Sequence, residues 1–279
     1  MKKVFLLLVL AVATFTLFAC NSSEYKVDGE FVAFDIHEHS NGTPMVTSVS
    51  VTIEKGKIVG YYIDALQSTK SEEGVFTWNA KTKKELGDDY GMVEKGGAVA
   101  EWYVQAELIE DYMLENGVDS VESDNDKYIT NITGVTMKDG DYTKLAADAL
   151  ELAKKGEFQA YLPIHHSNGT PNVVYATLTV DAKGNMTDLV LDTLQAKVEE
   201  GVFTWNAKSK QELGFDYGMV ERGGATLEWF EQAELLTDHI LENGWTMNGE
   251  PSVTGVTITT DSYFETFDLL FGFAGDSVK

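Results

Sequence analysis

Alternating apolar and polar side chains predict strands in two separate parts of the chain. In the first part the alternation covers residues 31–36, 49–53 and 58–63, and a Lys55-Gly56-Lys57 turn separates the last two. Period-two alternation on both sides of a turn is typical of an antiparallel hairpin. The same pattern returns over 173–180 and 186–192, on either side of a turn at 181–185. The chain therefore predicts two antiparallel sheets of similar construction.

Apolar residues at helical spacing predict helices after each hairpin. Trp102, Ala106, Ile109 and Met113 recur every three or four residues in a segment that ends at Asn116-Gly117. The remaining elements expected on the same grounds are a matching helix over 228–243, helices over 141–155 and 262–272, and short β-like segments over 130–137 and 252–259. These elements predict an α+β fold of two tandem homologous domains, each an antiparallel sheet with hairpins packed by helices.

An internal repeat accounts for this doubled pattern. Residues 74–98 and 201–225 are identical at 21 of 25 positions, with an offset of 127 (201 − 74), and the same offset relates HSNGTP at His39 to HSNGTP at His166. A period this long indicates a duplicated domain, because solenoid repeats are much shorter. We expect domains over 29–156 and 157–279, each carrying one copy of whatever performs the function.

The first residues predict export. Met1-Lys2-Lys3 is followed by an apolar run to Phe18 and by small residues before Cys20, which is typical of a lipoprotein signal peptide over 1–19. We expect Cys20 to carry lipid, residues 20–28 to form anchor and tether, and the domains to lie on the extracellular face of the cell membrane. The chain has no other cysteine, which excludes an intrachain disulfide and a thiolate metal site.

Composition narrows the classes of partner. A hydrophobic fraction of 43% and an aromatic fraction of 11% can fill two cores. The formal net charge of −24 argues against nucleic acid as a partner. An acidic surface that favours solubility is a simpler interpretation of this charge than a site for cationic ligands.

A four-residue motif near the end of each repeat is the strongest chemical signal. Thr133-Gly134-Val135-Thr136 matches Thr254-Gly255-Val256-Thr257 at an offset of 121 (257 − 136), so the second copy lacks six residues just upstream (127 − 121). Hydroxyls, a glycine and a following helix could form a seat for a phosphate group. The alternative is structural: the threonines cap the helix that follows.

With its surroundings, such as GVTMKDGDYTKLAADAL, this motif resembles that of the FMN-binding domain family, which includes two-domain flavinylated lipoproteins of Gram-positive extracellular electron transfer. The resemblance covers most of both repeats, including KTKKELGDDYGM and EWYVQAE. It implies that a Mg-dependent flavin transferase joins FMN to Thr136 and Thr257 through a phosphoester. The family's alanine is Val135 and Val256 here, and the acidic residue expected six positions before each acceptor is Thr130 and Pro251.

The most repeated segment also offers candidates for contact with a flavin ring. Tyr90-Gly91-Met92 and its twin Tyr217-Gly218-Met219 could form an apolar wall, with the glycine letting backbone approach the ring. Trp78 and Trp205 could do the same, or could be ordinary core residues. Lys83 and Lys210 could offset negative charge on a reduced flavin, although an exposed lysine is the simpler expectation.

The other side chains predict no metal or hydrolase site. The histidines beside HSNGTP lack metal-ligand spacing, and Ser-Asn-Gly-Thr-Pro is typical of a turn. No Ser-His-Asp order or Gly-x-Ser-x-Gly sequence supports a hydrolase.

The function that the resemblance implies is an extracellular electron carrier with two covalent FMN groups. It would receive electrons from a membrane NADH dehydrogenase through the quinone pool and pass them to ferric iron or soluble flavin. The alternatives are a small-ligand-binding lipoprotein and a flavin-dependent reductase of one organic acceptor.

Overall fold

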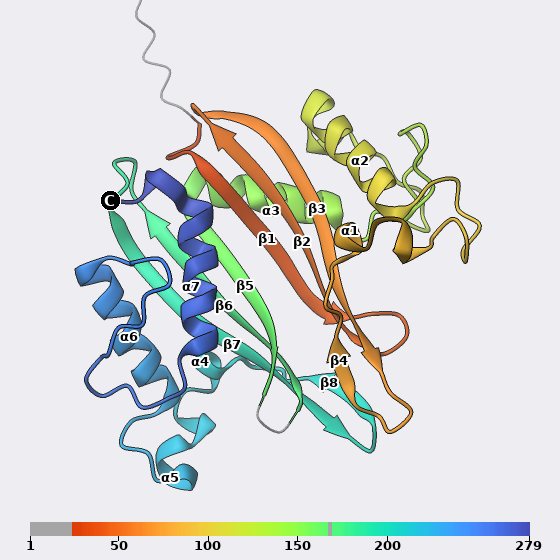
Figure 1. Ribbon diagram of the computed structural model, residues 1–279. Helices are drawn as coiled ribbons and strands as arrows, with labels where there is room; N and C mark the ends of the chain where they lie inside the picture. The colour runs from red at the N-terminus through yellow and green to blue at the C-terminus, as the bar shows by residue number, and fades with distance from the viewer. Residues whose placement is uncertain (1–23, 167–168) are drawn as a thin grey trace, which may run out of the picture.

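The computed structural model describes residues 24–166 and 169–279, and these form two similar α+β domains (Figure 1). The first contains β1 (Gly29–Glu38), β2 (Pro44–Glu54), β3 (Lys57–Lys70), β4 (Phe76–Trp78), α1 (Lys83–Leu86), η1 (Gly87–Tyr90), α2 (Trp102–Asn116), η2 (Val118–Ser120) and α3 (Tyr142–Lys155). The second contains β5 (Glu157–His165), β6 (Pro171–Val180), β7 (Met186–Glu199), β8 (Val202–Trp205), α4 (Lys210–Leu213), η3 (Gly214–Tyr217), α5 (Met219–Gly223), α6 (Trp229–Asn243), α7 (Asp261–Ala274) and η4 (Gly275–Ser277).

Each domain has a four-stranded antiparallel sheet in the part of the chain that the structure describes, in the order β1-β2-β3-β4 or β5-β6-β7-β8. The register is the same in both. Met45 on β2 lies opposite Gln67 on β3, and Asn172 on β6 lies opposite Gln195 on β7. The two sheets can therefore be compared strand by strand and position by position.

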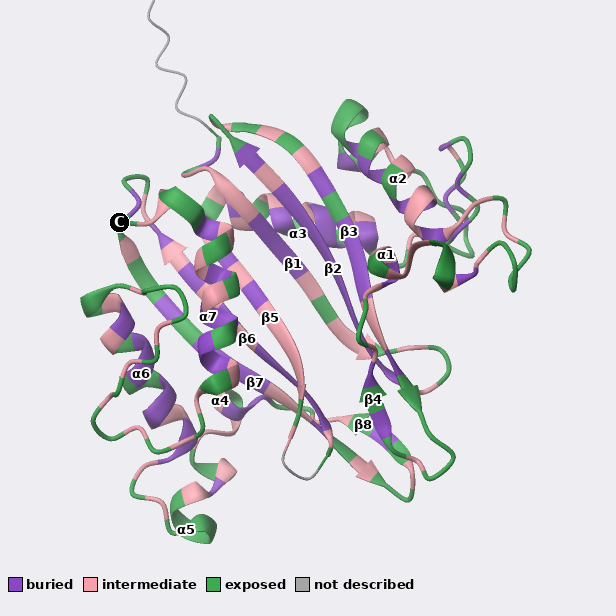
Figure 2. Cartoon of the chain, in the orientation of Figure 1, coloured by how far each residue is buried: buried purple, intermediate pink, exposed green. Residues whose placement is uncertain are grey.

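Helices cover the sheets in matching positions. α2 packs on β3 and α6 on β7, while α3 packs on β1 and β2 and α7 on β5 and β6. Figure 2 shows the buried residues concentrated on the strands and on the helix faces turned toward them. The largest fully buried side chains come from both domains: Phe31, Ile53, Ile63, Phe76, Ile109, Met113, Phe158, Leu178, Leu191, Trp229, Leu236 and Phe267. The α+β fold with two similar domains is thus confirmed.

Several element predictions are confirmed and one is wrong. The hairpins and the helices at 101–116, 141–155, 228–243 and 262–272 are present, the last of them extending over Asp261–Ala274. The segments at 130–137 and 252–259 are not strands. Each contains a tight turn, in which Val135 N–H donates to Ile132 O (3.2 Å) and Val256 N–H donates to Val253 O (3.1 Å). Gly134 and Gly255 have φ of +89° and +94°, which the β region does not allow.

The domains pack through a near two-fold arrangement in which residues touch their own twins. The rings of Phe31 and Phe158 stack with centroids 4.3 Å apart, and those of Trp78 and Trp205 lie 6.4 Å apart. Trp78 Nε1 donates to Ile164 O (3.0 Å), while Trp205 Nε1 donates to His37 O (3.1 Å). Ile164 and His37 are themselves twins at the offset of 127 (164 − 37). This is the isologous contact of a symmetric dimer, formed within one chain.

The expected signal peptide and Cys20 lie outside the described residues. Of the expected tether, residues 24–28 are described, and they contact the first domain. Tyr25 is buried, and the Asp28 carboxylate accepts from Lys55 N–H (2.6 Å) and Gly56 N–H (2.9 Å). These contacts hold the start of the described chain against the β2–β3 turn.

Candidate functional site

The twin motifs form the same turn in both domains and expose the same hydroxyl. Thr133 and Thr136 are exposed, as are Thr254 and Thr257. Val135 is buried and Val256 is half-buried, so the turn is fixed by its third residue. A Cβ on Gly134 would lie 3.0 Å from Leu108 Cδ1, and on Gly255 2.9 Å from Leu235 Cδ1, which shows how closely the turn approaches α2 or α6.

A buried glutamine holds the last threonine of each motif. Gln105 Oε1 accepts from Thr136 N–H (2.7 Å) and Thr136 Oγ1 (3.4 Å), and its amide nitrogen donates to Ala100 O (2.9 Å). Gln232 does the same for Thr257 N–H (2.7 Å) and Thr257 Oγ1 (3.2 Å) while donating to Leu227 O (3.0 Å). Because the amide nitrogen is engaged elsewhere, the oxygen must face the threonine. Both hydroxyls are therefore held at a fixed place on the surface.

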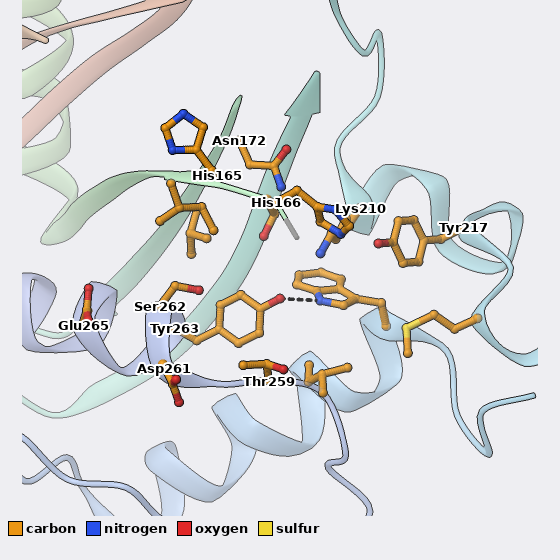
Figure 3. Close-up of a pocket in the computed structure, with 16 residues that line it drawn as sticks. His165, His166, Asn172, Lys210, Tyr217, Thr259, Asp261, Ser262, Tyr263 and Glu265 are labelled. Carbon is orange, nitrogen blue, oxygen red and sulfur yellow. Dashed lines mark hydrogen bonds between the residues drawn. The ribbon is translucent and has the colours of Figure 1, made fainter. Parts of the chain in front are cut away.

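A cavity of about 630 Å³ lies beside Thr257 in the second domain. The two residues after Thr257, Ile258 and Thr259, line it, so Thr257, which is not itself a lining residue, adjoins its wall. Figure 3 shows Asn172 and Lys210 on one side of this space and Thr259 and Tyr263 on the other. Aromatic and sulfur-containing side chains complete the wall: Tyr217, Met219 and Trp229.

Lys210 is the one cation among the residues that line this cavity, and it is buried rather than exposed. Its Nζ lies 5.3 Å from the ring centre of Tyr217 and 5.0 Å from that of Trp229. Within the described chain it has no hydrogen-bond or ion-pair partner. Burial lowers the pKa of Lys210 to about 8, and Asp192 opposes that shift. The expectation of an exposed lysine is thus wrong, because the Tyr and Trp rings cover the side chain.

The first domain repeats this arrangement around Lys83. Its Nζ lies 5.4 Å from the ring centre of Tyr90 and 5.1 Å from that of Trp102, and burial again lowers its pKa to about 8. Trp102 packs edge-on against Tyr142, as Trp229 does against Tyr263. Trp229 Nε1 also donates to the Tyr263 hydroxyl (2.9 Å), and this hydrogen bond is the dashed line that ends at Tyr263 in Figure 3. A lysine enclosed by two aromatic rings is therefore a property of both domains.

The Tyr-Gly-Met segments lie at this site, but the glycine has a different task from the one expected. Tyr217 and Met219 line the cavity, whereas Gly218 is not among its lining residues. Gly91 and Gly218 have φ of +75° and +73° and end the short helices η1 and η3. A Cβ on Gly218 would lie 2.5 Å from Arg222 Nε. The glycine is required by the turn.

Trp78 and Trp205 are brought together at the domain interface, and neither is among the residues that line the cavity. The HSNGTP segment at His39 forms the expected turn, with Gly42 N–H donating to His39 O (2.8 Å). In the second copy Gly169 N–H donates to His166 O (2.7 Å), and residues 167–168 lie outside the described part of the chain. Within the described residues there is no group of three His, Cys, Asp or Glu side chains that could hold a metal ion.

Sequence reasoning missed Gln105, Gln232 and Asn172. The glutamines occupy the same position of the twin helices, in WYVQAE and WFEQAE, and a polar residue on the apolar face of a helix is the signal that could have found them. Asn172 carries no such signal, because its twin position is Met45 (172 − 127).

The residues that line the cavity can be compared with what the ring of FMN requires of a binding site. A planar ring system needs apolar and aromatic walls with a few polar groups. The second domain supplies three aromatic rings, a methionine, one buried cation and a buried amide, together with the exposed carboxylates of Asp261 and Glu265. These residues fit the ring in the cavity and the phosphate outside it, on Thr257.

Comparisons with known proteins give little direct guidance. No protein-family model matches the chain, and no curated protein does. A solution NMR structure of a protein from Clostridium thermocellum, a structural genomics target, is similar over 46% of this chain and 92% of its own length, with 31% sequence identity and a TM-score of 0.31. The description of that protein states no activity, cofactor or partner. Among the helices of the described residues, none has the length and apolar character needed to cross a membrane.

Proposed function

We propose that this protein is a lipid-anchored electron carrier on the extracellular face of the cell membrane, with one FMN esterified to Thr136 and one to Thr257. A flavin transferase would attach both groups. Thr136 and Thr257 would hold the two groups, and each FMN would supply two-electron chemistry between a quinol, which leaves as quinone, and two ferric ions or one soluble flavin. The quinol would come from a membrane NADH dehydrogenase.

The observation that carries the proposal is the exposed threonine hydroxyl held beside an aromatic cavity. Gln232 fixes Thr257 next to the cavity wall, and Trp229, Tyr217 and Lys210 offer the ring an apolar wall with one positive charge. The protein's tasks would be to orient the ring, to exclude water from one face of it and to place a cation near the charge it gains on reduction. The same hydroxyl and glutamine in the first domain support a second group there.

Charge supports covalent rather than reversible retention. FMN phosphate is anionic and the chain has a formal net charge of −24, so the protein's field disfavours the free nucleotide. A tether also keeps the ring at a local concentration on the order of millimolar without tight binding. An exported carrier would otherwise lose its cofactor to the medium.

The test is covalent flavin content after coexpression with the transferase. We expect intact-mass analysis to show two added FMN groups in the parent chain, one in Thr136→Val, one in Thr257→Val and none in the double variant. Valine has nearly the shape of threonine without its hydroxyl, and both sites are exposed, so the folds should persist with unchanged circular dichroism. Thr133→Val and Thr254→Val, in the same turns, are the matched controls and should keep both groups.

A chain isolated from its native host with no flavin mass would contradict the proposal. Loss of flavin in Thr133→Val but not in Thr136→Val would move the attachment to another hydroxyl. If the native chain carries no flavin, the protein would be better described as a pair of domains that bind a small ligand reversibly.

A further inference from the structure

The inner wall of the second domain's cavity carries polar groups buried as deeply as its core. Asn172 on β6 and Thr193 on β7 are each 1% exposed, and both line the cavity. Asn172 Oδ1 has no hydrogen-bond partner among the residues that the structure describes. A buried amide group without a partner destabilises the fold, so its presence in a cavity wall calls for a ligand or water that completes it.

The first domain lacks this polar wall. The shared register puts Met45 where the second domain has Asn172, and Ala65 where it has Thr193. Exchanges in the other direction are Thr47, at the position of Val174, and His37, at the position of the cavity-lining Ile164. The lysine, tyrosine and tryptophan of the site are common to both domains, as described above. The buried amide is therefore a feature that the second site has and the first lacks.

The groups around this amide indicate the kind of ligand edge it would meet. Lys210 can only donate, Thr193 can donate or accept, and an amide can present either its oxygen or its nitrogen. They stand next to the aromatic side chains Tyr217, Trp229 and Tyr263. This combination fits a planar aromatic ring whose edge carries both carbonyl oxygens and an N–H, as the imide edge of a flavin does.

We propose that the second domain binds a flavin ring by directional hydrogen bonds from Asn172, and that the first domain, with Met45 at that position, does not. The two sites of the chain are therefore inequivalent: the ring is held in the second domain and only tethered in the first. The inference rests on the proposed function for the identity of the ring, but binding in the cavity can be measured without any covalent bond.

The test uses the full chain produced without a flavin transferase and riboflavin as the probe, because riboflavin has the ring but no phosphate. We expect equilibrium dialysis to give one riboflavin per chain. Asn172→Met should weaken that binding at least tenfold. Because this variant copies the first domain's own residue in the same register, it should fold, which a thermal unfolding curve will check. Thr193→Ala, which copies Ala65 of the first domain, is a second variant and should also weaken riboflavin binding.

The matched reciprocal variant is Met45→Asn with Ala65→Thr in the first domain, which should add a second riboflavin site. No riboflavin binding, two equal sites in the parent chain, or an affinity unchanged in Asn172→Met would overturn the inference. Binding of uridine as tight as that of riboflavin would also overturn it, because uridine has the imide edge without the larger ring.

These outcomes separate the inference from the proposed function. If the native chain carries no covalent flavin but its riboflavin binding depends on Asn172, the proposed electron carrier is refuted and the proposed ring-binding role of Asn172 is supported. If both threonines carry covalent FMN but riboflavin binding does not depend on Asn172, the proposed function is supported and the role of Asn172 is refuted.

Discussion

At the scale of single residues, the buried lysines are the least expected side chains in this molecule. Lys83 and Lys210 are each 7% exposed, and each has two aromatic rings near its Nζ in place of a carboxylate. Cation–π contact with two rings recovers part of the hydration that the ammonium loses. The lowered pKa of about 8 indicates that the loss is larger than the recovery. A charge kept at such a cost suits a site that receives an anion.

This cost predicts how stability depends on pH. The pKa of Lys210 is about 8 in the folded protein and 10.5 in its unperturbed form, so the folded state prefers the neutral amine. The stabilising effect of that preference is complete above pH 10.5 and is lost as pH falls through 8. Lys210→Met should therefore raise the free energy of unfolding of the flavin-free chain at pH 7 by up to roughly 3 kcal/mol.

The gain should shrink between pH 8 and 10.5 and vanish above that range, as measured by urea denaturation at a series of pH values. The exposed Lys208 is the control, since Lys208→Met should have no such pH dependence. A gain that stayed constant through this range would show that packing, and not charge, is responsible.

At the scale of elements, one buried contact between helix and sheet differs in its chemistry between the two domains. In the first, Lys84 Nζ pairs with Glu110 Oε1 (2.6 Å), which also accepts from Ile63 N–H on β3 (2.6 Å). Both side chains are 10% exposed. In the second domain Gln211 donates to Leu191 O (3.0 Å), and the buried Thr237 takes the place of the acid. The ion pair thus links α2 to β3 in the first domain, whereas in the second a neutral hydrogen bond links α4 to β7 and Thr237 donates within α6, to Glu234 O (3.1 Å).

The exchange predicts that the ion pair is harder to break than to replace. Lys84→Ala leaves the Glu110 carboxylate buried without its cation and should lower the free energy of unfolding by about 3 kcal/mol. The double variant Lys84→Gln, Glu110→Thr copies the second domain and should lose clearly less. Urea denaturation of the two variants and of Glu110→Thr alone measures the coupling. A double variant no more stable than Lys84→Ala would mean that the neutral residues of the second domain cannot replace the ion pair in the first.

At the scale of the whole molecule, the duplication has produced an internal symmetric dimer. Twin aromatic residues stack on each other, and each interface tryptophan donates to the backbone of the opposite domain. Tyr161 of β5 also donates to Ser48 Oγ of β2 (3.0 Å). These contacts fix the relative position of the domains, and therefore of the two threonine sites.

The interface predicts cooperative unfolding that depends on both tryptophans. Trp78→Phe and Trp205→Phe should each lower the free energy of unfolding by about 1 kcal/mol, because each removes one cross-domain hydrogen bond while keeping a ring. We expect one calorimetric transition in the parent chain and two in the double variant, one for each domain. Trp245→Phe is the control: its indole donates to Asp268 within the second domain (2.9 Å), so it should shift one domain without uncoupling them. A double variant that still melts in one transition would count against the interface as the source of coupling.

Local patterns predicted much of the fold. The hairpins, the main helices and the duplication follow from periodicity and glycine stops, which act between neighbours in the chain and can be recognised without a structure. The twin Thr-Gly-Val-Thr motifs were also visible, and their turns contain the glycines that a positive φ requires. The prediction of strands there failed because three apolar positions in a short segment do not distinguish a strand from a turn.

The sequence by itself determined two α+β domains and the pair of hydroxyls that each could offer to a phosphate. Only the tertiary structure decided which repeated residues serve the site and which serve the interface. Trp205 and Trp229 are equally apolar, yet one contacts the other domain and the other covers Lys210. The difference between Asn172 and Met45 likewise gains meaning only from the strand register that puts both at the same place. Such contacts join residues far apart in the chain, so no local pattern records them, and they exist only once the strands and helices have packed.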